Sequence, residues 1–305
     1  MAFLDERRWQ GKIFDGTWRT ADGGVTAVVE PATGDKLGTV GFAALSDLER
    51  SALRAREAQV AWASAPFRQR AAVMRRAAEL WATYSDDIQG WLVRESGGTR
   101  AKTARELSDA VDECLEASAL PSHALGEVLP SEKAPLSMSR RVPVGVVGVI
   151  APFNAPVKLA IRSVAPALGL GNAVILKPDP RTPVSGGVVF AWIFEEAGLP
   201  AGVLHVLPGG GDIGSALVTD ANVQAVSFTG STQAGQSVGE RAVSAVHDEG
   251  AATLTFGKTP GRARRAEAAP CGYDATRASV SASTAARFAV SPALRWCRAA
   301  SASGA

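Results

Sequence analysis

Apolar residues recur at helical spacing in the N-terminal third of the chain, at Leu48, Ala52, Ala55, Val73, Ala77, Leu80, Trp81 and Tyr84. This spacing is typical of helices with one buried face. Ser46 and Glu49 match a capping box, in which a hydroxyl and a carboxyl group satisfy amides at a helix start, so we expect helix from there. Gly97-Gly98 supplies a stop, and a further helix is expected from Thr103 to about residue 119.

Two other segments have a strand-like pattern. Residues 17–45 read as short strands, with turn signals at Asp22-Gly23-Gly24 and Thr33-Gly34-Asp35, and we expect an edge hairpin there. Residues 127–142 form short extended pieces that prolines interrupt, and prolines favour edge strands.

Four short aliphatic runs, at 144–150, 173–176, 203–207 and 225–228, alternate with helical patterns in the second half of the chain. Runs without polar alternation that are separated by helices indicate a parallel sheet buried on both faces. The predicted fold is therefore α/β, a doubly wound parallel sheet with a helical N-terminal part and an edge β-hairpin.

Composition narrows the class of protein. The chain has 305 residues, 46% of them hydrophobic and 20% charged, and a net charge of +2, so no nucleic-acid or membrane partner is indicated. Charged residues interrupt the start of the chain, and no apolar run approaches the ~18 residues of a membrane helix. We expect a cytoplasmic protein. The cysteines Cys114, Cys271 and Cys297 are widely spaced, which supports neither a disulfide framework nor a metal site.

Polar or glycine-bearing positions follow three of the predicted strands. Asn154 lies in a Pro-Phe-Asn turn after the first strand, Lys177 ends the second, and Gly230-Ser231 opens a helix after the last. Ligands of open α/β sheets bind at the carboxyl edge of the strands. Each motif alone has an ordinary structural reading: a turn asparagine, a solvated lysine, or a strand-to-helix turn. Together they predict a binding site.

These motifs, with Glu195-Glu-Ala-Gly-Leu-Pro200 and Leu207-Pro-Gly-Gly210, match in order and spacing the aldehyde dehydrogenase superfamily, which the chain resembles over residues 25–247. Lys177-Pro-Asp-Pro-Arg-Thr-Pro183 is most similar to benzaldehyde, vanillin and salicylaldehyde dehydrogenases. The resemblance implies a Rossmann-like NAD(P)-binding domain at 1–247, with a hairpin near 126–143 that resembles an oligomerisation segment. It implies oxidation of an aromatic aldehyde to a carboxylic acid, in a family of homo-oligomers.

The resemblance also assigns roles to residues. Asn154 would be the oxyanion donor. The implied cofactor-binding positions are Ile150, Ala151, Pro152, Phe153, Lys177, Pro178, Asp179, Gly210, Gly214, Phe228, Thr229, Gly230, Ser231 and Gly235. Lys177 would bind the adenosine ribose, and helix-opening amides would meet the pyrophosphate. Pro180 stands where many members have a ribose-binding glutamate, which leaves both NAD and NADP open. The glycines at 210–214 also fit a simple flexible loop, and His205 and Cys114 read as buried core.

Residues 248–305 differ from the rest of the chain and from the family. They are rich in Ala, Ser, Arg and Gly, which makes a packed core difficult, and we expect an atypical, disordered tail. The family's Glu-Leu-Gly-Gly segment is replaced by Thr253-Leu-Thr-Phe-Gly257, and a Gly-Gln-x-Cys stretch is missing. Cys297 comes too late and has the wrong neighbours.

We therefore expect the catalytic domain to be largely absent and the chain to be catalytically incomplete. A shift of the coding frame near His247 would account for the altered tail. The alternatives at this stage are an aldehyde-oxidising enzyme, a catalytically inactive nucleotide-binding or assembly module, and, least favoured, a protein with a nucleic-acid-binding tail.

Overall fold

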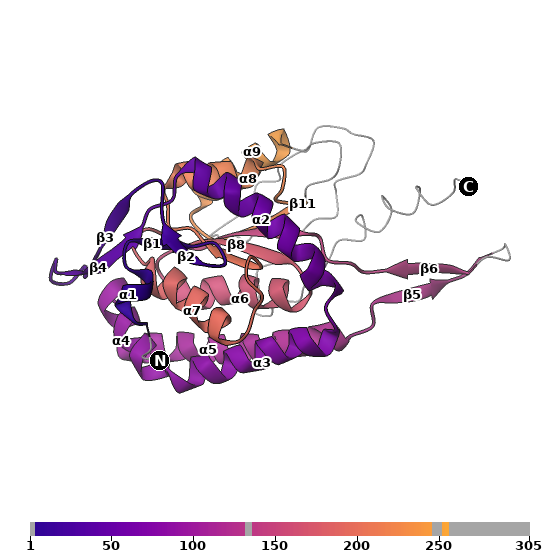
Figure 1. Ribbon diagram of the computed structural model, residues 1–305, viewed down its shortest axis with the longest axis horizontal. Helices are drawn as coiled ribbons and strands as arrows, with labels where there is room; N and C mark the ends of the chain where they lie inside the picture. Colours follow the sequence, from indigo (N-terminus) through magenta and orange to yellow (C-terminus); the bar gives the residue numbers. More distant parts are fainter. Residues whose placement is uncertain (1–3, 132–135, 246–251, 256–305) are drawn as a thin grey trace. The chain divides into compact units, whose positions relative to one another are not determined.

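The computed structural model describes residues 4–131, 136–245 and 252–255 (Figure 1). Within these residues, the contacts define two units. The larger unit contains 4–123, 142–245 and 252–255, and the smaller contains 124–131 and 136–141. The prediction of a disordered tail concerns residues that, apart from 252–255, lie outside the described residues, and so do Cys271 and Cys297.

The larger unit begins with a short helix and two pairs of strands. These elements are α1 (Glu6–Trp9), β1 (Lys12–Phe14), β2 (Trp18–Thr20), β3 (Val25–Val29) and β4 (Lys36–Gly41). β1 and β2 pair antiparallel, and β1 also pairs antiparallel with a later strand through Phe14 and Val206. β3 and β4 form a separate two-stranded sheet. The prediction of an edge hairpin within residues 17–45 is only partly right. The hairpin in that range, β3–β4, forms a separate sheet, and the pair at the edge of the main sheet is β1–β2, whose first strand precedes the predicted range.

Four helices follow: α2 (Leu45–Ser64), α3 (Phe67–Thr83), α4 (Ser85–Ser96) and α5 (Arg100–Ala119), with a 3-10 turn η1 (Leu120–Ser122). The predicted apolar positions from Leu48 to Trp81 are buried and Tyr84 is half-buried, and Gly97 ends α4 in the left-handed conformation at φ 68°. The predicted capping box is wrong. α2 begins at Leu45, and the carboxyl group of Asp47 accepts the Ala44 amide at 2.9 Å, because the acidic side chain three residues after the N-cap is Asp47.

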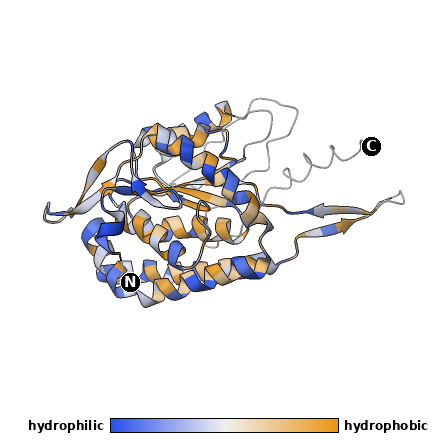
Figure 2. Ribbon diagram, viewed as in Figure 1, coloured by the Kyte–Doolittle hydropathy of each residue, from blue (hydrophilic) through white to orange (hydrophobic). Residues whose placement is uncertain are grey.

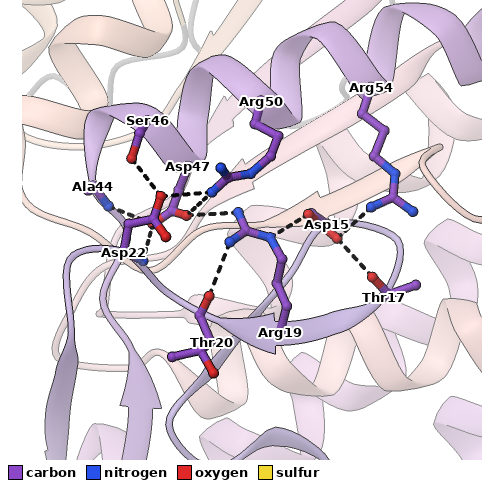
Figure 3. A network of polar contacts seen from close by, with 10 residues as sticks. All are labelled: Asp15, Thr17, Arg19, Thr20, Asp22, Ala44, Ser46, Asp47, Arg50 and Arg54. Carbon is purple, nitrogen blue, oxygen red and sulfur yellow. Dashed lines mark hydrogen bonds and ion pairs between the residues drawn. The ribbon is translucent and has the colours of Figure 1, made fainter.

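A network of charged side chains, with buried aspartates and partly exposed arginines, joins the β1–β2 pair to α2 (Figure 3). Asp15 pairs with Arg19 at 2.5 Å and Arg54 at 3.0 Å. Asp47 pairs with Arg19 and Arg50, each at 2.8 Å. Both aspartates are almost fully buried, so each arginine compensates a carboxylate that has lost its water.

Within the described residues, the main sheet has seven strands in the order β11-β10-β7-β8-β9-β1-β2. Its further strands are β7 (Val146–Ile150), β8 (Ala173–Lys177), β9 (Leu204–Val206), β10 (Ala225–Phe228) and β11 (Ala252–Thr255). Neighbours from β11 to β9 pair parallel, as the aliphatic runs predict. β11 lies beyond the predicted boundary at residue 247, so the sheet continues into the segment that departs from the family.

Helices cover both faces of this sheet (Figure 1). The connecting helices are α6 (Pro156–Gly169), the π-helix η2 (Val184–Val188), α7 (Val189–Glu196), α8 (Gly211–Thr219) and α9 (Thr232–Ser244). One apolar core lies among α3, α5, α6 and α7, and a second among α2, α8 and α9. Figure 2 shows α2 and α3 with alternating polar and apolar residues, as expected for outer helices, while β8 is buried throughout and apolar up to its last residue, Lys177.

The smaller unit is a β-hairpin of β5 (Gly126–Leu129) and β6 (Ser137–Arg140). The strands pair antiparallel from Gly126 with Arg140 to Leu129 with Ser137. Val128 and Met138 are directly opposite each other, and their side chains are 67% and 62% exposed. Because these apolar side chains remain exposed, the hairpin gains little stability from burying them.

Candidate functional site

The carboxyl ends of three neighbouring strands lie at the same level of the sheet. Ile150 at the end of β7 is paired with Lys177 on one side and Phe228 on the other. Two further backbone bonds continue the ladder beyond the strands, from Ala151 N to Lys177 O at 3.2 Å and from Thr229 N to Ile150 O at 3.0 Å. The structure therefore brings together the three strand ends that the sequence singled out.

The turn after β7 carries the predicted oxyanion donor. Ala151 is buried, whereas Phe153 and Asn154 are exposed, before α6 begins at Pro156 with Ala155 as its N-cap. Proline at the first helical position fits a helix start, because that position has no intrahelical acceptor for an amide. The side-chain amide of Asn154 is thus held on a short turn at the carboxyl edge of the sheet.

Lys177 is buried although it ends a strand at this edge. Its side chain is 7% exposed, and its Nζ donates a long hydrogen bond, 3.4 Å, to the carbonyl oxygen of Pro178. Burial lowers the pKa of this ammonium group, while the nearby carboxylates of Asp179 and Asp212 raise it. A buried ammonium group with one long bond has donors to spare for a polar ligand.

Glycines of α8 make room beside Lys177. A Cβ built on Gly214 would lie 3.6 Å from Lys177 Cδ, so the helix backbone approaches the lysine side chain as closely as an ordinary contact allows. Gly210 is the N-cap of α8, where a Cβ would meet the carboxyl group of Asp212 at 2.6 Å. The structure thus places Gly210 at the start of α8 and Gly214 beside Lys177, and at Gly210 a side chain would collide with Asp212.

Asp179, Arg181 and Phe153 link the loops that follow β8 and β7. Arg181 Nε and Nη2 donate to the two carboxyl oxygens of Asp179, both at 2.8 Å, and its guanidinium lies 3.5 Å from the centre of the Phe153 ring. Burial raises the pKa of Asp179, but the bonds from Arg181 outweigh burial and the net pKa is lowered. The carboxylate of Asp179 is therefore ionised close to Lys177, and the guanidinium of Arg181 balances its charge.

The start of α9 forms the third part of the edge. Ser231 is its N-cap, and its hydroxyl accepts the Ala234 amide at 3.3 Å, while the Gly235 amide bonds to the Ser231 carbonyl at 2.9 Å. A Cβ on Gly230 would meet the Phe228 ring at 2.5 Å, so a side chain there would displace this ring. The remaining amides of this first turn belong to a helix N-terminus, which attracts anions.

The structure adds contacts that the sequence reasoning missed. Arg162 of α6 donates to the Thr229 hydroxyl at 3.1 Å, and Ser163 and Ser227 share a hydrogen bond of 2.8 Å. Burial lowers the pKa of Arg162. One signal was available, because hydroxyl residues in a strand buried on both faces need a partner. No sequence pattern indicated that the partner would be Arg162.

Two other predicted core residues are placed as expected. Cys114 is fully buried in α5, and burial raises the pKa of its thiol, so it is not activated as a thiolate. His205 is fully buried in β9 and its Nε2 bonds to the Gly202 carbonyl at 2.8 Å, although in the described part of the chain Nδ1 has no partner. Among the described residues, no group of three or more His, Cys, Asp or Glu is placed to hold a metal ion.

Comparison with known proteins agrees with this geometry. The aldehyde dehydrogenase family matches residues 18–252, and the chain belongs to that family. A vanillin dehydrogenase of an Amycolatopsis species is 63% identical over 242 residues, which are 79% of this chain and 50% of that protein. A benzaldehyde dehydrogenase [NAD(+)] of Pseudomonas putida is 48% identical over 234 residues, 76% of this chain and 48% of that protein.

A solved structure shows the same fold. The crystal structure of a NAD-dependent benzaldehyde dehydrogenase from Corynebacterium glutamicum superposes with a TM-score of 0.77 at 38% identity, covering 84% of this chain and 55% of that one. The predicted fold class and family are confirmed. The chain spans about half the length of the curated relatives that it matches. Across the described residues, no helix is long and apolar enough to cross a membrane.

Proposed function

We propose that the larger unit binds NAD or NADP at the carboxyl edge formed by β7, β8 and β10. The buried ammonium group of Lys177 carries the proposal, because it offers donors to a ribose at the point where α8 leaves room beside it. The N-terminus of α9, from Ser231, offers amides to a pyrophosphate. The residues around these two groups would line the dinucleotide: Ile150, Ala151, Pro152, Phe153, Pro178, Asp179, Gly210, Gly214, Phe228, Thr229, Gly230 and Gly235.

The reaction that we propose for the whole protein is oxidation of an aromatic aldehyde to the acid. NAD(P)+ supplies the hydride acceptor when bound. The side-chain amide of Asn154 is exposed at the site edge and would donate to the oxyanion that forms when a nucleophile attacks the aldehyde. Vanillin and benzaldehyde dehydrogenases among the relatives support an aromatic substrate.

A second candidate function is a nucleotide-binding or assembly module without turnover. The observation that favours it is that the one cysteine among the described residues, Cys114, is buried with a raised thiol pKa. A hydrogen-bond donor such as Asn154 stabilises an oxyanion but does not create one. We therefore propose that this chain binds the cofactor and does not oxidise aldehydes by itself.

The exposed apolar hairpin β5–β6 would serve self-association, and the cytoplasm is the proposed location.

Fluorescence titration of the full chain with NADH and NADPH tests cofactor binding. We expect Lys177→Ala to raise the Kd about tenfold or more, the loss expected for a hydrogen bond from a charged donor. Lys36→Ala is the control, because Lys36 is exposed on β4. Equal affinity of the chain and Lys177→Ala would remove Lys177 from the site, and no binding at all would refute the proposed function.

An aldehyde-dependent assay tests turnover on the same preparation. We expect no NAD(P)H production above background at saturating benzaldehyde, even with cofactor bound. Turnover that Cys297→Ser abolishes would show that the nucleophile is present, and would overturn the proposal of an inactive chain.

A further inference from the structure

Glu95 at the end of α4 is a buried carboxylate that makes its hydrogen bonds with a different element. Its side chain accepts the amides of Val184 at 2.8 Å and Ser185 at 2.7 Å, and also the hydroxyl of Ser185. Val184 and Ser185 are the first two residues of η2 and are fully buried. Glu95 itself is 2% exposed.

The local sequence cannot supply this cap. The first amides of a helix have no intrahelical partner, and a side chain of the N-cap residue usually accepts one of them. The N-cap of η2 is Pro183, whose side chain has no acceptor. Glu95 therefore supplies from α4 the acceptors that the start of η2 lacks.

The glycines that follow in η2 pack closely against residues of both loops of the candidate site. A Cβ on Gly186 would lie 3.0 Å from Pro156 Cβ, and a Cβ on Gly187 would lie 2.9 Å from Pro178 Cγ. Pro178 follows Lys177 directly, and Pro156 begins α6 immediately after the turn that carries Asn154. Because these positions have no side chain, the backbone of η2 packs directly against the two prolines.

We infer that Glu95 is a positioning residue of the cofactor site, which holds η2 so that Gly186 and Gly187 fix the backbone on which Lys177 and Asn154 are carried. This inference rests on the proposed function for its effect on cofactor binding. The clamp of Glu95 on η2 is independent of any ligand. Loss of the carboxyl group leaves two buried amides without an acceptor, which loosens the start of η2 first.

Two measurements on the full chain test the inference. Amide hydrogen exchange of peptides from residues 178–188 reports the clamp, and NADH titration reports the site. We expect Glu95→Ala to accelerate exchange in these peptides and to raise the Kd for NADH about tenfold. Glu95→Gln keeps one acceptor oxygen, so its increases in exchange rate and in Kd should be smaller than those of Glu95→Ala.

Control variants separate positioning from general instability. Val28→Ala removes a buried side chain from β3, which belongs to the separate two-stranded sheet, and should leave the Kd and exchange in 178–188 unchanged in the folded protein. Gly187→Ala should weaken NADH binding, because its Cβ meets Pro178. Gly90→Ala in α4, with nothing within 4 Å of its Cβ, should not.

The inference is overturned if folded Glu95→Ala keeps the native Kd and native exchange, or if Val28→Ala weakens binding as much. Absence of NADH binding by the unsubstituted chain would refute the proposed function instead. The exchange data would then still decide whether Glu95 holds η2 and its neighbouring loops.

Discussion

Gly214 faces Lys177 so closely that an added Cβ would lie 3.6 Å from Lys177 Cδ and 3.7 Å from Cε. One methyl group fits at that distance, and alanine in a helix is about 1 kcal/mol more favourable than glycine. Gly214→Ala should therefore raise the stability of the protein and keep NADH binding. Gly214→Leu should displace Lys177 and weaken binding about tenfold or more.

The matched control is Gly90→Leu, since a Cβ on Gly90 in α4 has nothing within 4 Å. NADH titration and urea unfolding of these three variants, compared with the unsubstituted chain, test the prediction. Native affinity of Gly214→Leu would show that the lysine side chain does not need its present position.

Arg181 neutralises Asp179, and its removal should change the preference between cofactors. Arg181→Ala frees a carboxylate close to Lys177, where it would repel a ribose 2'-phosphate. At an effective dielectric constant between those of water and protein, this repulsion is worth about 1 to 4 kcal/mol. The ratio of Kd for NADPH to Kd for NADH should rise about tenfold. Arg181→Lys, which keeps the charge, should change the ratio less, and an unchanged ratio in Arg181→Ala would contradict the placement of the ribose.

Two buried groups should give the stability opposite dependences on pH. Burial raises the pKa of Glu95 from 4.5 to about 7, so the folded chain holds this proton more tightly than the unfolded chain. The free energy of unfolding therefore falls as pH rises from 4.5 to 7. Burial lowers the pKa of His205 from 6.5 to about 4, so the unfolded chain binds that proton more tightly and the free energy of unfolding rises as pH rises from about 4 to 6.5.

Urea unfolding between pH 4 and 7.5 should separate the two effects. Glu95→Gln removes the falling contribution, so the stability of this variant should rise more steeply with pH up to about 6.5 than that of the unsubstituted chain. His205→Gln removes the rising contribution, so the free energy of unfolding of this variant should fall more steeply as pH rises from 4.5 to 7. Parallel profiles for Glu95→Gln and the unsubstituted chain would show that Glu95 titrates normally.

In the charge network of Figure 3, removing a buried aspartate should cost far more stability than removing an exposed one. Asp47 is fully buried, whereas the Asp22 side chain is 46% exposed. Asp47→Ala leaves Arg19 and Arg50 without this partner and the backbone amides of residues 22 and 44 without an acceptor, so we expect a loss of about 3 kcal/mol. Asp22→Ala should cost about 1 kcal/mol or less. Thermal unfolding of both variants measures the difference, and similar losses would contradict the expected effect of burial.

Much of the sheet could be predicted because its strands are marked locally. The runs that became β7, β8, β9 and β10 are aliphatic, and the alternation with helices requires parallel pairing. The start of α2 could not be placed correctly, because the capping side chain proved to be Asp47 rather than a hydroxyl residue. Nothing local indicated that Phe14 would pair with Val206.

The candidate site was likewise predictable only in part from the sequence. Asn154, Lys177 and Gly230 could be placed at one edge from the sequence, since parallel strands share the level of their carboxyl ends. The bonds from Arg162 to Thr229 and from Ser185 to Glu95 join different helices and strands. Contacts of this kind depend on how helices dock, and a single sequence contains no periodic signal for them.

The pairing of Phe14 with Val206 also has a consequence for synthesis. β1 emerges from the ribosome with β2 as its neighbour, but its other edge must remain open until β9 has been translated. An unpaired strand edge is a template for pairing with another chain. Nascent copies on one messenger therefore each carry an unpaired β1 edge until β9 is made, and slow elongation before residue 204 would lengthen the period in which they can aggregate.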